Sequence, residues 1–171
     1  MCIRDRDTAL FRRLLSDLSR TEQYVEMVMA FLRLEDAPGD YVFREVALDE
    51  VLRQALRRFS AEFIDRRLRL DYTPTGLTVL TDEKWLCFVL EQLLSNALKF
   101  TPAGGTVTVE LKKSGETLRL TVSDTGCGIP PERMAHLFDG CFQPGHPSPA
   151  PYGLGLGLPL CRAIAEKHGG S

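Results

Sequence analysis

Apolar residues near the start of the chain recur three and four residues apart. The positions, one of them a threonine, are Phe11, Leu14, Leu18, Thr21, Val25, Val28 and Leu32. This spacing places a narrow apolar seam along one side of a helix, which we predict from about Asp7 to Leu34. The helix either packs on its own domain or forms half of a hairpin that pairs in a dimer. The strict heptad and the linker-like segment 35–40 favour the hairpin, with the helix outside the globular domain.

The next part of the chain predicts strands and helices in alternation. Residues 41–47 alternate between polar and apolar, as a strand does, and apolar residues of the segment 48–63 then mark one face of a second helix. We interpret the arginines on its other face as a solvated surface. Residues 68–73 and 77–80 predict short strands on either side of a hairpin-like turn, Pro74-Thr75-Gly76.

A third helix and five further segments complete the pattern. The third helix begins near Thr81 or Asp82, either of which can cap its first NH groups, and runs to about Leu98. We predict strands at 106–112 and 117–123, a short helix at 130–138, a mobile loop at 139–152 and a last helix at 156–167. This order predicts an α/β fold, a two-layer sandwich of a mixed β-sheet covered on one face by three helices and preceded by one long helix.

Composition narrows the possible functions by exclusion. The 171 residues are 44% hydrophobic and 26% charged, which is typical of a globular protein, and the net charge of −2 argues against a nucleic-acid partner. The five cysteines include no Cys-x-x-Cys pair, which argues against a disulfide framework or zinc site and favours a cytoplasmic setting. No apolar run approaches the ~20 residues that span a bilayer. We expect a fragment, because the opening residues 1–6 and the final Gly-Gly-Ser resemble cut ends.

The stretch Asp124-Thr-Gly-Cys-Gly-Ile129 is the first candidate for chemistry, at the exit of a predicted edge strand. A buried Asp124 can accept a hydrogen bond from an exocyclic amine, while Gly126 and Gly128 can adopt positive φ and present NH groups to a ligand. A plain turn between a strand and a helix has the same sequence, so this stretch alone does not identify a nucleotide site.

The third helix carries a second candidate set. Gln92, Asn96 and Lys99 are spaced by four and three residues, so they share one face beside the apolar one. The Asn96 carbonyl can serve a Mg²⁺ ion held between phosphate oxygens, and Lys99 can neutralise phosphate charge. An ordinary amphipathic helix is the alternative, but the two glycine-rich loops later in the chain, at 124–129 and 153–157, favour a ligand role.

A third candidate lies before the last helix. Gly153, Gly155 and Gly157 alternate with Leu154 and Leu156 and lead straight into that helix, whose free NH groups favour a phosphate chain. Such loops also act as hinges, but the position at a helix start favours a phosphate cradle. Neither a Walker nor a Rossmann glycine motif is present.

Taken together, these stretches resemble the ATP-binding domain of sensor histidine kinases, a Bergerat-type fold shared with gyrase, heat-shock chaperone and mismatch-repair ATPases. The resemblance covers about residues 41–171. The matching residues are Asn96, Lys99 and Phe100 of the Asn-rich helix; Asp124, Gly126, Gly128 and Ile129 of the adenine loop; Phe138 and Phe142 of the lid; and Gly153 to Gly157 of the second glycine loop.

The resemblance implies a role for each of these residues and segments. Asp124 would receive the adenine amino group, Asn96 would coordinate Mg²⁺, and the lid would close over the phosphates of ATP. Residues 1–36 would be the second helix of a dimerisation hairpin and 41–171 the catalytic domain. The whole protein would be a homodimer that phosphorylates a histidine on the missing first helix and serves a response regulator. It would reach a membrane only through missing upstream segments, with this domain on the cytoplasmic side.

Three departures from the family pattern leave an alternative open. Gln92 stands where these kinases often have Asn and the related ATPases Glu, and Phe138 and Phe142 are one residue further apart than in the commonest lid. None of His136, His146 and His168 is followed by an acidic residue, as the phosphorylated histidine would be. A conformational ATPase or a degenerate ATP-binding module is the alternative, although an amide at Gln92 cannot act as the base for hydrolysis.

Overall fold

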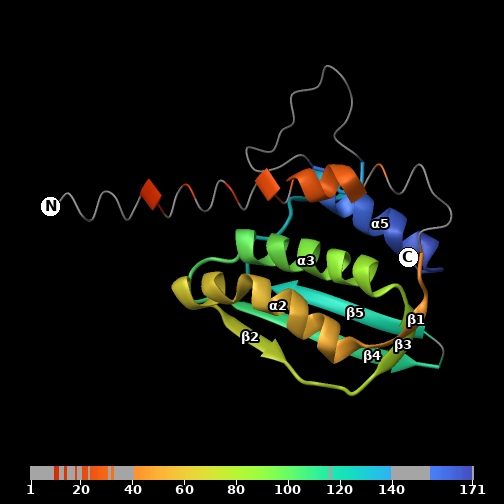
Figure 1. The fold of residues 1–171 in the computed structure, drawn as a ribbon. Coiled ribbons are helices and arrows are strands. Elements are labelled where there is room, and N and C mark those ends of the chain that lie inside the picture. The colour runs from red at the N-terminus through yellow and green to blue at the C-terminus, as the bar shows by residue number, and fades with distance from the viewer. Residues whose placement is uncertain are drawn as a thin grey trace, which may run out of the picture.

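The computed structural model describes residues 10, 11, 14, 18, 21, 22, 24–30, 32, 41–115, 117–139 and 155–170 (Figure 1). From residue 41 its elements are β1 (Arg44–Ala47), α2 (Leu48–Asp65), β2 (Arg69–Tyr72), β3 (Thr78–Thr81), α3 (Glu83–Phe100), β4 (Thr106–Ser114), β5 (Thr117–Asp124), α4 (Pro131–Met134) and α5 (Gly157–Lys167).

The predicted α/β fold class is confirmed, with α2 and α3 on one face of the sheet and α5 beside α3. None of the described helices is both long and apolar enough to cross a membrane.

The described strands form two sheets rather than one. A mixed sheet has the order β2-β4-β5, with β2 parallel and β5 antiparallel to β4, and β1 pairs with β3 in an antiparallel ladder. The predicted hairpin between residues 68–73 and 77–80 is therefore wrong, since β2 and β3 belong to different sheets.

The physical reason is a buried carboxylate at the start of α2. Asp49 accepts hydrogen bonds from the Tyr72 hydroxyl, from the Gly76 NH at 2.7 Å and from the Thr75 NH at 3.2 Å. The Leu48 NH also donates to the Leu77 carbonyl at 3.0 Å. These bonds hold the 73–77 connection against the first turn of α2. The chain therefore continues into β3, which pairs with β1, instead of folding back on β2.

The hydrophobic core lies between the two main helices and the mixed sheet. The apolar stripe of α2 and that of α3 face each other and the strand residues Val107 and Val109. Each large side chain buried in this way contributes roughly 1.5–3 kcal/mol of transfer free energy. The buried helix residues are Val51, Leu52, Ala55 and Phe59 from α2 and Cys87, Leu90, Leu94, Ala97 and Leu98 from α3.

Both ends of α3 are fixed by side chains. Asp82 caps the first turn by accepting from the NH groups of Lys84 at 3.0 Å and Trp85 at 3.2 Å, which confirms the predicted start. At the other end, Arg66 donates to the carbonyls of Leu98 and Thr101. These bonds satisfy polar groups that a helix end leaves open, so the position of the last turn of α3 is well defined.

The N-terminal seam helix, helical at residues 21, 22 and 24–30, lies against the domain. Met27 is buried and packs against Leu156 and Leu160 at the start of α5. The expectation that this helix stands outside the globular domain is therefore wrong at residues 24–30. The seam itself points away from this contact. Its described apolar residues, Phe11, Leu14, Leu18, Val25, Val28 and Leu32, are all exposed.

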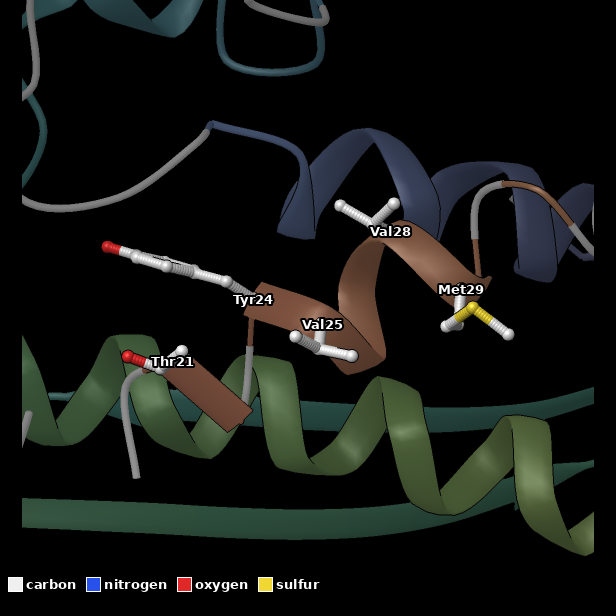
Figure 2. A pocket seen from close by; sticks show the side chains of 5 residues that line it. All are labelled: Thr21, Tyr24, Val25, Val28 and Met29. Atoms are coloured by element: carbon white, nitrogen blue, oxygen red, sulfur yellow. The ribbon is translucent and has the colours of Figure 1, made fainter. Parts of the chain in front are cut away.

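A shallow hollow of about 250 Å³ lies on the exposed side of this helix. Figure 2 shows that its lining side chains, Thr21, Tyr24, Val25, Val28 and Met29, all come from the seam helix, beside α3 and α5. The helix thus has two apolar faces, one against α5 and one open.

An ion-pair cluster joins the seam helix to α2 and α3. The Arg58 guanidinium lies 3.1 Å from a Glu26 carboxylate oxygen and 2.9 Å from one of Glu91. Burial raises the pKa of Glu91, with the charge of Glu26 acting in the same direction and that of Arg58 opposing it. The interpretation of the α2 arginines as a solvated surface is thus wrong for Arg58.

We expect Asp49→Asn to destabilise the domain by about 1–3 kcal/mol at pH 7, because an amide cannot replace all three hydrogen bonds. The Tyr72 hydrogen bond lowers the pKa of Asp49, so the carboxylate stabilises the fold above the ordinary carboxyl pKa, and this contribution is lost as pH falls through the folded-state pKa. Urea unfolding at neutral and acid pH should show the variant losing less stability on acidification. Asp71→Asn, at an exposed site on β2, is the control; an equal loss in both variants would contradict this role.

Arg58→Ala should loosen the seam helix, because Glu26 and Glu91 would then face each other without the cation between them. We expect amide hydrogen exchange in residues 24–30 to accelerate by about fivefold or more. Arg53→Ala, on the exposed face of α2, is the matched control. Unchanged exchange in Arg58→Ala would show that apolar packing of Met27 alone holds the helix.

Candidate functional site

The polar face of α3 meets the start of α5. Gln92 and Asn96 are half-buried on this face, one turn apart. A Cβ atom added to Gly157 would lie only 2.8 Å from the Gln92 side-chain oxygen, so the glycine allows this approach. Two segments that the sequence singled out separately are thus brought together.

The loop after β5 lies on the last turn of α3. The Gly126 NH donates to one Asp124 carboxylate oxygen at 2.8 Å, which leaves the other oxygen as an acceptor for a ligand. A Cβ atom on Gly126 would lie 2.6 Å from the Phe100 carbonyl oxygen, so only glycine fits between the loop and the helix. Gly128 has φ of +70°, as predicted, whereas Gly126 does not have the positive φ expected for it. Asp124 itself is exposed rather than buried.

A second contact fixes the base of the same loop. The Thr125 NH donates to the Thr106 carbonyl at 3.1 Å, and the Thr106 NH donates to the Thr125 hydroxyl at 2.9 Å. The loop therefore leaves the sheet in a direction set by β4, and the carboxylate of Asp124 is held at the end of β5.

Aromatic and cationic side chains surround these segments. Lys99 Nζ lies 5.0 Å from the centre of the exposed Phe100 ring, and Arg162 of α5 lies 5.2 Å from the centre of the Phe138 ring. Ile129 is exposed. Such apolar groups can contact a planar base, while the cations can face phosphates. Phe142, Gly153 and Leu154, the other predicted residues, lie outside the described residues.

The start of α5 offers backbone donors. Gly155 has φ of +67°, Leu156 is buried, and no side chain caps the first turn of the helix. Since the first NH groups of a helix have no intrahelical partner, an anion can be bound here. The described residues contain no group of three His, Cys, Asp or Glu side chains that could hold a metal.

Sequence reasoning missed two supporting features. Arg66, just after α2, ties α2 to the carbonyls that end α3. Thr101 adds a hydrogen bond from its hydroxyl to the Ala97 carbonyl at 2.5 Å. A threonine just beyond the end of a helix is a weak cap signal, whereas nothing in the sequence pattern indicates the partner of Arg66.

A family model and individual relatives point to the same protein family. The family described as histidine kinase-, DNA gyrase B-, and HSP90-like ATPase matches residues 81–171. The chain is 30% identical over 162 residues to the sensor-like histidine kinase SenX3 of Mycobacterium bovis, covering 93% of this chain and 39% of that protein. It is 40% identical over 123 residues to the histidine protein kinase DivJ of Caulobacter vibrioides, covering 71% of this chain and 21% of that protein. The chain thus spans less than half of either relative.

Solved structures agree. A mycobacterial sensor histidine kinase, MprB, superposes with a TM-score of 0.64 at 31% identity, over 76% of this chain and 83% of that one. Full-length ShkA in complex with AMPPNP superposes with a TM-score of 0.73 at 26% identity, over 100% of this chain and 35% of that one. With three motifs converging in the geometry described above, the chain belongs to the family of histidine kinase-, DNA gyrase B- and HSP90-like ATPases, and its fold is that of a sensor histidine kinase catalytic domain.

Proposed function

We propose that this chain binds Mg-ATP between α3, the loop 124–129 and the start of α5, and transfers the γ-phosphoryl group to a histidine on a separate hairpin helix. The observation that carries the proposal is the convergence of three segments: Gly126 lies against the Phe100 carbonyl, and Gly157 lies against Gln92. These two contacts bring the polar face of α3, the loop 124–129 and the start of α5 to one place, where the backbone of the glycines can come close to a ligand.

Each residue then has a chemical task. The second Asp124 oxygen accepts the adenine amino group, and Phe100 and Ile129 contact the base. Backbone NH groups of Gly155 and Gly157 face the phosphates, and Lys99 neutralises their charge. Bound Mg²⁺ would offset phosphate charge, and the Asn96 carbonyl with phosphate oxygens suits its preference for oxygen ligands.

The reaction is an in-line transfer. A neutral imidazole nitrogen forms a bond to the γ-phosphorus while the bond from that phosphorus to the β,γ-bridging oxygen breaks, and ADP leaves. The nitrogen lone pair needs no base before attack, whereas water does. Gln92 offers only an amide, so histidine is favoured over water as the nucleophile.

In this proposal the seam helix links the ATP-binding domain to the helix that carries the acceptor histidine. Its Met27 face holds the start of α5, and its exposed seam can bury apolar area against the first hairpin helix and a second copy of the chain. We propose this arrangement for a homodimer that passes the phosphoryl group to a response regulator. In the full-length sensor this domain would lie on the cytoplasmic side of a membrane.

Asp124→Asn should weaken ATP binding by at least about tenfold, because the amide is a poorer acceptor than a carboxylate for the adenine amine. Calorimetry with ATP and GTP in the presence of Mg²⁺ would measure this loss and the loss of preference for adenine. Asp71→Asn is the control at an exposed site. Equal ATP affinity in Asp124→Asn and the parent chain would refute the adenine assignment.

When the chain is extended upstream by a first hairpin helix carrying the acceptor histidine, γ-labelled ATP should label it. We expect the label to be acid-labile and alkali-stable, as a phosphoramidate is, and to fall at least about a hundredfold in Asn96→Ala. Ser95→Ala, the preceding residue of α3, is the control. The 171-residue chain alone should stay unlabelled. Multiple turnovers of ATP by that chain would indicate an ATPase, and ATP binding without labelling of the extended protein would indicate a degenerate module.

A further inference from the structure

A second surface hollow, of about 400 Å³, lies between α2 and β2, away from the nucleotide site. Its floor is apolar. Leu56 and Phe63 pack on the core beneath it, while Ile64 and Leu70 are 75% and 38% exposed. Large apolar side chains exposed together on one surface are typical of an interaction site.

The charged side chains that line this groove are both cationic. Arg53 and Arg57 line it, and no acidic residue does. Arg53 pairs at 3.0 Å with the exposed Glu50. Within the described part of the chain, no carboxylate lies within ion-pair distance of Arg57. The groove therefore favours a partner that brings acidic groups beside an apolar face.

The spacing of the lining residues along α2 suits a helix as the partner. Its α2 side repeats at Arg53, Arg57 and Ile64 over eleven residues, about 16 Å or three helical turns. Such a ridge can pack against the ridge of a second helix. Addition of a strand is disfavoured, because β2 has only four residues and carries the charged Arg69 and Asp71 at the outer edge of its sheet.

We propose that the groove between α2 and β2 docks an amphipathic helix of a partner protein, with leucine-like residues on the floor and acidic residues beside Arg53 and Arg57. This is the helix-in-groove mode of recognition, in which side chains at i, i+3, i+4 and i+7 of the partner act as anchors. The surface does not involve Asn96 or Asp124, so the proposal stands or falls independently of nucleotide binding.

The test uses a capped 15-residue peptide with leucine at i, i+3, i+4 and i+7, glutamate on both flanks of that stripe, and a lactam bridge that locks the helix. Fluorescence anisotropy with the full chain should show saturable binding. Arg57→Glu should weaken it about fivefold or more, and a peptide with lysine in place of glutamate should regain affinity for that variant. Ile64→Ser should weaken binding by about tenfold.

Matched controls separate this surface from general stickiness. Leu80→Ser removes a side chain that is 70% exposed on β3, and Arg119→Glu reverses an exposed charge on β5; neither should change the affinity. ATP binding should be unaffected in all four variants. No saturable binding, equal binding of a proline-broken peptide, or equal loss in the controls would each overturn the proposal. Self-association that Ile64→Ser abolishes in sedimentation would overturn it in favour of a contact between copies.

Discussion

The position of α3 is the constraint on which the rest of the structure depends. One side of this helix supplies much of the core, while the opposite side brings Gln92 beside Gly157 at the start of α5 and carries Asn96 one turn further along. A slip of α3 along its axis would lose core packing and site geometry together. Asp82 at its first turn and Arg66 at its last carbonyls oppose such a slip, because each would leave polar groups unsatisfied.

Elements and motifs could be predicted from the sequence because they are local. From residue 41 onward, apolar periodicity marked the helices and strands within a few residues of their observed bounds, except that the helix predicted at 130–138 is only Pro131–Met134. The glycines at 126 and 157 marked positions of close approach. Strand pairing between β2 and β3 could not be predicted, since Pro74-Thr75-Gly76 suits a hairpin as well as a crossing. The choice is made by Asp49, which precedes that turn by some 25 residues and binds it through a buried carboxylate.

The ion pairs of Arg58 are a second feature that could not be predicted from the sequence, here at the surface of a helix. In the sequence, Arg58 and Glu91 are charged residues on two amphipathic helices, and solvation is the natural interpretation of both. Arg58 also pairs with Glu26 of a third element, and Met27 of that element packs in one apolar cluster with Leu156 and Leu160. A surface pattern cannot predict a partner whose position is set by packing elsewhere in the chain.

That packing also joins the seam helix to the candidate phosphate loop. Met27 belongs to one apolar cluster with Leu156 and Leu160, and Leu156 lies between Gly155 and Gly157, the two glycines at the start of α5. If the seam helix moved away, Leu156 would lose part of its apolar cover, so the loop is more stable in its present conformation while the helix is docked. A ligand that binds this loop conformation must then favour the docked helix by the same free energy, because coupling between two sites is reciprocal. The seam that remains exposed on the opposite face of the helix is therefore free to pair without breaking the contact at Leu156.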